Sequence, residues 1–262
     1  MGRIVVDISD AVATATISAP PMNALDTAMR AELADHLRRF ENDDAIRTIV
    51  LRGDGPKAFC AGFDIKEMTA NLGSAAQTLA QFQTDAVLFD RLAHCAKPTL
   101  AVVEGVALGG GLELAVCCDF IIAGERARFG LPETKLGAIP AVGGTLRVTR
   151  QIGPARARQL ILLGDPIDAA TALNWGLVAR VLPQEDLAQE SAAFAQRLAA
   201  APALAMQYAK RAIASSLDAD EASALAVARE HAARLATSDD LAEGVRSFIE
   251  RRSPVFRDTI DR

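Results

Sequence analysis

The chain has 262 residues, of which 50% are hydrophobic, enough to bury the core of one large domain with or without a smaller appendage. Its formal net charge of −5, with no run of Lys or Arg, argues against a nucleic-acid partner. The N-terminus lacks a signal-peptide pattern, and no stretch approaches the ~20 apolar residues that span a bilayer, so we expect a cytoplasmic protein without a membrane partner.

Alternating strands and helices are predicted for the first half of the chain. Two β-rich runs at 4–9 and 12–18 flank a short polar turn and favour a hairpin. Asp26 is expected to cap a helix whose apolar residues recur on one face. This pattern is typical of strand–strand–helix units rather than strict βαβ alternation. Further elements are expected as strands at 48–55, 99–105 and 119–124 and as a long helix at 73–96.

The second half, from about residue 143, is predicted to be nearly all helical, with one strand at 177–183. Two acid pairs have the spacing of N-terminal capping boxes, Asp218 with Glu221 and Asp240 with Glu243. An apolar stripe at helical spacing is predicted near the C-terminus. Because a small helical appendage cannot bury such a stripe alone, we expect another subunit to cover it. That stripe consists of Leu225, Ala228, Ala232 and Leu235.

A glycine-rich run is the strongest candidate for a functional site. Between Glu104 and Glu113 a predicted strand enters a predicted helix through Gly109, Gly110 and Gly111. Glycine allows close approach of the backbone to a ligand, and the free N–H groups at a helix start attract negative charge. The spacing matches neither the dinucleotide fingerprint nor the phosphate loop, which favours an oxyanion as the ligand. A turn that merely packs a strand against a helix explains the same glycines, so both interpretations stay open.

Two acids and one cysteine could take part in catalysis, but each also has an ordinary structural explanation. Glu113 lies in the first turn of the predicted helix, where a carboxylate also stabilises the helix dipole. Glu133 follows Pro132 and is equally explained as a solvated loop acid. Cys60 has no base motif nearby and is better explained as a small core residue than as a nucleophile. The four cysteines and three scattered histidines indicate neither a disulfide framework nor a metal site.

Together these segments resemble the enoyl-CoA hydratase/isomerase family, also called the crotonase superfamily, over essentially the whole chain. The most specific parts are FCAGFDIKEM at 59–68 and KPTLAVVEGVALGGGLELAVCCD at 97–119. The resemblance implies an α/β fold, a crotonase-like spiral of ββα units over residues 1–197. It also implies a C-terminal helical oligomerisation region over 198–262 that forms a homotrimer or homohexamer.

The resemblance implies that water is added across the 2,3 double bond of a 2-enoyl-CoA, as in β-oxidation. In such enzymes two backbone N–H groups hold the thioester carbonyl, and the matching groups here belong to Phe63 and Gly110. Glu113 would position and deprotonate the water, and Glu133 would give a proton to the α-carbon. Many isomerases of the family retain one of the two glutamates, so the pair favours a hydratase. CoA is part of the substrate, and no metal or other cofactor is implied.

The resemblance also implies contacts to the substrate and its CoA. The positions that match are Ala61, Asp64, Ile65, Lys66, Gly109, Ala141 and Arg251. In relatives the late basic position reaches CoA phosphates from a neighbouring subunit, a role suited to Arg. Two departures affect specificity: the segment 19–22 is short and uncharged, and Ala141 stands where many hydratases have glycine.

Alternatives with the same oxyanion site stay open at this level, because one fold supports many reactions. They are a 3,2-enoyl-CoA isomerase, a hydratase-lyase, a decarboxylase and a thioester hydrolase. A non-catalytic relative that binds acyl-CoA or RNA is a different class, although the acidic composition argues against RNA.

Overall fold

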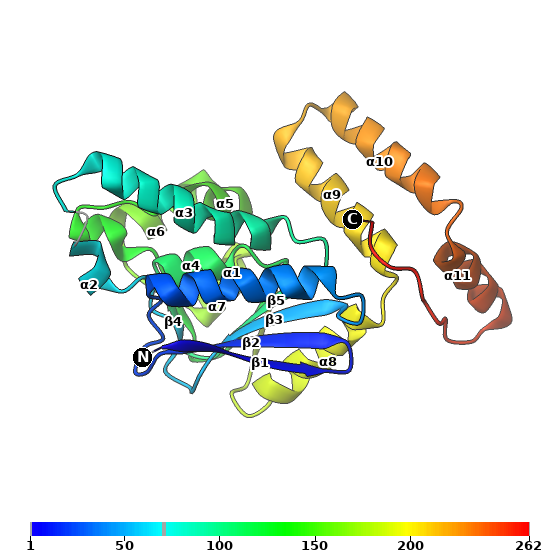
Figure 1. Ribbon diagram of the computed structural model, residues 1–262, viewed down its shortest axis with the longest axis horizontal. Helices are drawn as coiled ribbons and strands as arrows, with labels where there is room; N and C mark the ends of the chain where they lie inside the picture. The colour runs from blue at the N-terminus through cyan, green and yellow to red at the C-terminus, as the bar shows by residue number, and fades with distance from the viewer. Residues whose placement is uncertain (1, 70–71, 262) are drawn as a thin grey trace.

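Two β-sheets and their connecting helices form the main body of the computed structural model, which describes residues 2–69 and 72–261 (Figure 1). In the described residues the larger sheet has the order β1 (Arg3–Ser9), β2 (Val12–Ser18), β3 (Thr48–Gly53), β5 (Thr99–Val103), β7 (Phe120–Gly124) and β10 (Arg180–Leu182). The smaller sheet has the order β4 (Ala58–Cys60), β6 (Val106–Leu108), β8 (Arg128–Gly130) and β9 (Ile167–Asp168).

Successive strand pairs divide between the two sheets. In each of the pairs β3–β4, β5–β6 and β7–β8 the first strand joins the larger sheet and the second joins the smaller one. Equivalent strands of successive pairs are parallel neighbours: β5 pairs with β3 and with β7, and β6 pairs with β4 and with β8. The chain therefore advances as a spiral of strand–strand–helix units, which confirms the predicted arrangement.

The two faces of the larger sheet bury different sets of side chains, because successive residues of a strand point to opposite faces. On one face Ile49 and Leu51 belong to the same apolar cluster as Leu33 of α1 (Thr27–Asn42). On the other face Val50 and Leu100 pack in a second cluster with residues of α8 (Leu187–Ala199). The central strands are thus covered on both sides, and the core is continuous with the small sheet on the α1 side.

The N-terminal elements agree with the sequence prediction. β1 and β2 form an antiparallel hairpin whose turn places Asp10 and Ala11 at positive φ, 48° and 64°. Helix α1 begins after Asp26, whose side chain accepts a hydrogen bond from the Met29 amide at 2.8 Å. The predicted long helix is α3 (Ala75–Ala93), which begins after Ser74.

The other helices complete the spiral and the C-terminal region. They are α2 (Ile65–Met68), α4 (Gly110–Ala115), the 3-10 helix η2 (Pro132–Leu136), α5 (Gly144–Ile152), α6 (Pro154–Leu163), α7 (Ala169–Trp175), α9 (Ala203–Asp218), α10 (Glu221–Leu235) and α11 (Asp239–Glu250). The predicted capping boxes at 218 and 240 are wrong. Asp220 caps α10 through the Ser223 amide, and Ser238 caps α11 through the Leu241 amide, each at 3.1 Å.

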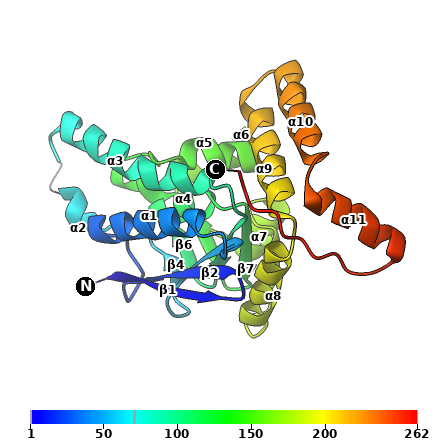
Figure 2. The same cartoon turned by 45° about the vertical axis from the view of Figure 1, so that its right-hand side comes forward.

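Helices α9, α10 and α11 extend away from the sheets, as both views show (Figures 1 and 2). No residue of α10 is fully buried. Of the predicted stripe, Leu225, 44% exposed, and Ala232 are exposed, whereas Ala228 and Leu235 are half-buried. On α11 the side chains of Phe248 and Ile249 are 85% and 74% exposed. None of the helices in the described part of the chain has the length and apolar character that crossing a membrane would require.

Candidate active site

The segments that follow two neighbouring strands meet at the glycine-rich turn. Strand β4 leads through Gly62 into Phe63, and the neighbouring strand β6 leads through Gly109 into α4. A Cβ atom on Gly62 would lie 3.1 Å from the carbonyl oxygen of Leu108 and 3.4 Å from the amide nitrogen of Gly110. The turn after β4 is therefore packed directly against the start of α4.

The backbone amides of Phe63 and Gly110 were predicted as the oxyanion donors. Leu25 donates its N–H to Gly62 O at 2.8 Å and accepts from the Asp64 amide at 3.0 Å. The Phe63 amide lies between these two groups in sequence and takes no part in this pairing. Gly110 is the first residue of α4, where an amide has no acceptor within the helix. These two main-chain donors on adjacent turns suit a developing oxyanion.

The ring of Phe63 explains why residue 110 is glycine. A Cβ atom on Gly110 would lie 2.7 Å from Phe63 Cε1, well inside van der Waals contact. Phe89 meets the ring edge-on, with centroids 6.0 Å apart, and the Arg30 guanidinium carbon lies 4.6 Å from the ring centroid. The ring is thereby fixed on three sides, which also fixes the backbone that carries the Phe63 amide.

Glu113 is buried, with 2% of the residue exposed, and its carboxylate is held by backbone amides. Oε1 accepts hydrogen bonds from Val142 N at 3.0 Å and from Gly144 N, the first residue of α5, at 2.7 Å. Burial raises the pKa of Glu113 to about 7, the Gly144 amide lowers it and the charge of Glu133 raises it further. This carboxyl group can therefore gain or lose a proton near neutral pH.

Glu133 reaches the same turn from the next strand exit. It lies in η2, directly after β8, and its Oε1 would be 3.1 Å from a Cβ on Gly109. Burial raises the pKa of Glu133, and its Oε2 is buried without a hydrogen-bond partner in the described part of the chain. A buried carboxyl oxygen of this kind is suited to hold a water or a substrate group. The fold thus brings the two predicted acids to opposite ends of the first turn of α4.

A supporting contact, which the sequence did not reveal, fixes the loop that holds Glu113. Arg147 Nη1 donates to the carbonyl oxygen of Val142 at 3.0 Å, and its Nη2 pairs with Asp90 Oδ1 at 2.7 Å. A Cβ on Gly144 would lie 2.8 Å from Glu113 Cγ, so the carboxylate requires glycine there. The pair Gly143-Gly144 before a helix was the available sequence signal.

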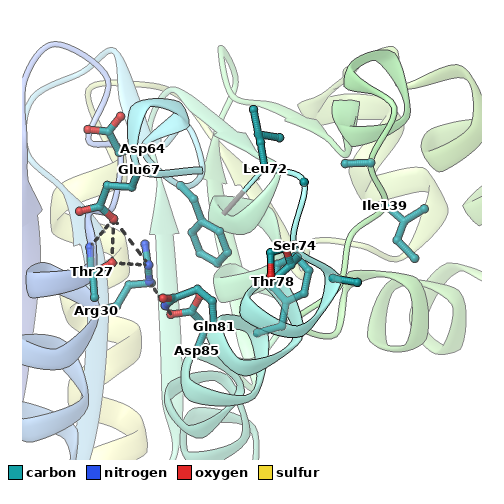
Figure 3. Close-up of a pocket in the computed structure, with 15 residues that line it drawn as sticks. Thr27, Arg30, Asp64, Glu67, Leu72, Ser74, Thr78, Gln81, Asp85 and Ile139 are labelled. Atoms are coloured by element: carbon teal, nitrogen blue, oxygen red, sulfur yellow. Dashed lines mark hydrogen bonds and ion pairs between the residues drawn. The ribbon is translucent and has the colours of Figure 1, made fainter. Parts of the chain in front are cut away.

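A cavity of about 480 Å³ lies next to the Phe63 turn (Figure 3). Apolar side chains cover most of its wall and come from Phe63, Leu72, Ala75, Phe82, Ala138 and Ile139. Polar side chains gather on the side of α1, where Figure 3 shows Thr27, Arg30, Glu67, Gln81 and Asp85 linked to one another. The cavity has the apolar character expected of a pocket for an acyl chain.

Most of the other predicted contact residues lie near this site. Gly109 forms part of it, and Ala61 and Asp64 flank the Gly62–Phe63 turn. Ile65, 62% exposed, and Lys66 lie on the surface of α2. Ala141 is exposed and directly precedes Val142.

Arg251 is an exception. Arg251 ends α11 in the left-handed conformation. In both views α11 lies on the opposite side of the molecule from α2 (Figures 1 and 2). A single chain therefore does not bring Arg251 to the site. Cys60 is buried, and burial raises the pKa of its thiol to about 12, which favours the core interpretation over a nucleophile. Among residues 2–69 and 72–261, no cluster of three or more His, Cys, Asp or Glu could hold a metal ion.

Comparisons with known proteins agree with the geometry. The sequence model of the family described as enoyl-CoA hydratase/isomerase matches residues 7–259. A probable enoyl-CoA hydratase of Rhizobium meliloti is 40% identical over 255 residues, with 97% of each chain covered. A 2,3-dehydroadipyl-CoA hydratase of Escherichia coli is 36% identical over 258 residues, covering 98% of this chain and 99% of the relative. The solved structure of an enoyl-CoA hydratase from Bacillus anthracis has a TM-score of 0.91 and 33% identity, covering 97% of this chain and 98% of that one.

Proposed function

Since the chain belongs to the enoyl-CoA hydratase/isomerase family and has its spiral fold, we propose that it is an enoyl-CoA hydratase. The reaction adds water across the 2,3 double bond of a 2-enoyl-CoA and gives a 3-hydroxyacyl-CoA. The observation that carries this proposal is the pair Glu113 and Glu133, two carboxyl groups with raised pKa values beside the glycine-rich start of α4.

The thioester oxygen is polarised by the amides of Phe63 and Gly110. As water attacks C3, negative charge moves onto this oxygen, and donors fixed in advance stabilise that charge without reorganising. Removing one such donor costs roughly 2.7–4 kcal/mol of transition-state stabilisation in comparable sites. The close packing of Gly62 against Gly110 supports this role, because it holds the two turns that carry the donors next to each other.

The two carboxyl groups move the protons. Glu113 takes a proton from the water, whose oxygen forms the bond to C3, and Glu133 gives a proton to C2. Glu113 suits the base because its pKa of about 7 leaves a large ionised fraction at neutral pH. Burial raises the pKa of Glu133 and so favours the protonated form that an acid needs. The unpartnered Oε2 of Glu133 supports its role as the group that touches the reactants.

The remaining contacts are part of the same proposal. Ala61, Asp64, Ile65, Lys66, Gly109 and Ala141 line the path of the thioester and its CoA. Arg251 reaches CoA phosphates on a neighbouring subunit in a homotrimer or homohexamer, whose interfaces cover the exposed side chains of α10 and α11. The enzyme needs no metal, no separate cofactor and no nucleic-acid or membrane partner, and it acts in the cytoplasm.

The test is the loss of ultraviolet absorbance of the conjugated thioester in crotonyl-CoA, with the product identified by mass. Wild type is compared with Glu113→Gln and Glu133→Gln, and exposed Glu125→Gln is the matched control. We expect both site variants to lose roughly 100- to 10,000-fold in rate, the range for a general acid or base, while the control keeps its rate. A folded wild type that hydrates no enoyl-CoA, or that mainly moves the double bond, contradicts the proposal.

A further inference from the structure

An ion pair buried in the wall of the acyl cavity carries a further inference. Arg30 of α1 and Asp85 of α3 pair at 2.7 Å, with their side chains only 6% and 4% exposed. Gln81 Nε2 donates to the same Asp85 oxygen at 3.1 Å, and both residues line the cavity. The charged groups therefore face the space beside Phe63 rather than solvent (Figure 3).

Each of the three nitrogens of the Arg30 guanidinium already donates a hydrogen bond to the protein. Its Nε donates to Asp85, its Nη1 donates to Leu25 O at 2.8 Å, and its Nη2 donates to Thr27 Oγ1 at 2.9 Å. Glu67 Oε2 lies 3.7 Å from Nη2, and the ring of Phe63 packs against the guanidinium at 4.6 Å. A bidentate contact to a substrate carboxylate needs two parallel N–H groups free of other acceptors. Because each nitrogen of Arg30 already has an acceptor in the protein, such a contact would have to compete with these bonds.

The charges on the wall are unbalanced. Among the described residues that line the cavity, Arg30 is the single cation, whereas Asp64, Glu67 and Asp85 are acids. A carboxylate at the end of an acyl chain would lose its hydration in this apolar space and would face like charges, while the one cation is already paired with Asp85. A neutral chain meets neither penalty, and the apolar residues of the opposite wall favour it.

We propose that the cavity selects neutral acyl chains and rejects chains that end in a carboxylate, through Asp85 and Glu67 acting with the engaged Arg30. This proposal rests on the proposed function, because it takes the Phe63 amide as the point from which the acyl chain enters the cavity. The other explanation is that the Arg30–Asp85 pair only joins α1 to α3, in which case the charges would not affect selection.

The test compares trans-2-hexenoyl-CoA with 2,3-dehydroadipyl-CoA, which have the same number of acyl carbons and differ in the terminal carboxylate. We expect kcat/KM for the neutral substrate to exceed that for the acid by about a hundredfold, since like-charge placement at a recognition surface costs several kcal/mol. Equal rates on the two substrates, or a preference for the acid, would overturn the proposal.

Two isosteric variants identify the source of the discrimination. Asp85→Asn keeps an oxygen for Arg30 Nε, and Glu67→Gln keeps an oxygen for the Thr27 amide, while each removes one negative charge. The measured quantity is kcat/KM for 2,3-dehydroadipyl-CoA divided by kcat/KM for hexenoyl-CoA. We expect each variant to raise this ratio by about tenfold. Asp35→Asn, an exposed residue of α1, makes the same change of net charge away from the cavity and should leave the ratio as it is. Site variants that fold and show the wild-type ratio would overturn the proposal.

A binding measurement separates this proposal from the function itself. Titration calorimetry with hexanoyl-CoA and adipoyl-CoA, which cannot be hydrated, should show weaker binding of the acid in wild type and a smaller difference in Asp85→Asn. If neither enoyl-CoA is hydrated, the proposed reaction is wrong, and this binding comparison alone decides whether the cavity discriminates by charge. Equal dissociation constants for the two thioesters would contradict it.

Discussion

Glu113 and Gly144 form one structural unit, in which the carboxylate accepts from the first amide of α5 at 2.7 Å and a side chain at residue 144 would strike Glu113 Cγ. The contact crosses from α4 to α5, 31 residues apart in the sequence. It places the carboxylate at the positive end of a helix, which offsets part of the cost of its burial.

Gly144→Ala should therefore displace the carboxylate of Glu113. The added Cβ would lie 2.8 Å from both Glu113 Cγ and Pro140 Cβ, and we expect kcat to fall by about 100-fold, as for a misplaced catalytic group. The steady-state rate on crotonyl-CoA measures this. Gly244→Ala in α11, where the nearest atom to a new Cβ is 3.6 Å away, is the matched control. Full activity of Gly144→Ala would show that the Glu113 position is not critical.

Glu113→Gln should stabilise the protein at high pH while it lowers the hydration rate. Because the folded-state pKa of Glu113 is about 7 and its ordinary value is 4.5, the carboxyl group adds stability below pH 4.5 that is lost as the pH rises to 7. Above pH 7 the variant should be more stable than wild type by on the order of 3 kcal/mol. Urea denaturation at pH 4.5, 6 and 8 measures the difference, and a difference independent of pH would contradict the prediction.

Arg147→Met should weaken the site through the loop. The variant loses the hydrogen bond to Val142 O, and with it the fixed position of the amides that hold Glu113. We expect kcat/KM to fall about tenfold, the value of a hydrogen bond to a charged group. The Arg147 charge lowers the pKa of Glu113, so the acidic limb of the pH profile should also move upward.

Two further variants distinguish the effect of the Arg147 charge from the effect of its hydrogen bonds. Arg147→Lys keeps the charge and should leave the acidic limb in place while the rate falls. Asp90→Asn removes only an exposed ion-pair partner, 59% exposed, and should have little effect. A pH profile that is the same in all three variants would show that Arg147 does not influence Glu113.

Gly110→Ala and Phe63→Ala should be strongly coupled. Alanine at 110 alone forces its Cβ against the Phe63 ring at 2.7 Å, and overpacking of this kind costs about 1–3 kcal/mol. Truncating the ring removes the clash, so the double variant should be more stable than the sum of the single effects predicts. Urea denaturation of all four proteins gives the coupling free energy. Additive effects would mean that the backbone moves to separate the two groups.

Local patterns predicted the elements well where propensity and burial agree. Asp26 caps α1 as expected, and the β-rich runs at 4–9 and 12–18 form the hairpin. The capping boxes failed because several cap-type residues precede each late helix. Ser238 lies two residues before Asp240, and the backbone uses the earlier one.

The site was only partly predictable, because its key distances join segments far apart in the sequence. The glycines at 109–111 and the two glutamates could be named from the sequence and the family resemblance. The hydrogen bonds from residues 142 and 144 to Glu113 depend on how α5 meets α4, and no local signal fixes that. The polar corner of Arg30 and Asp85 was missed for the same reason, since 55 residues separate them.

The division of strand pairs between two sheets has a consequence for how such a chain can change. Exits of the adjacent strands β4, β6 and β8 supply, in turn, the Phe63 amide, the Gly110 amide and the Glu133 carboxyl group. The first two are main-chain groups, which every substitution except proline keeps, whereas the third is a replaceable side chain. Under the proposed function, such a chain can keep its binding site for a thioester while the acids around it are exchanged, so that new reactions arise on an old binding site.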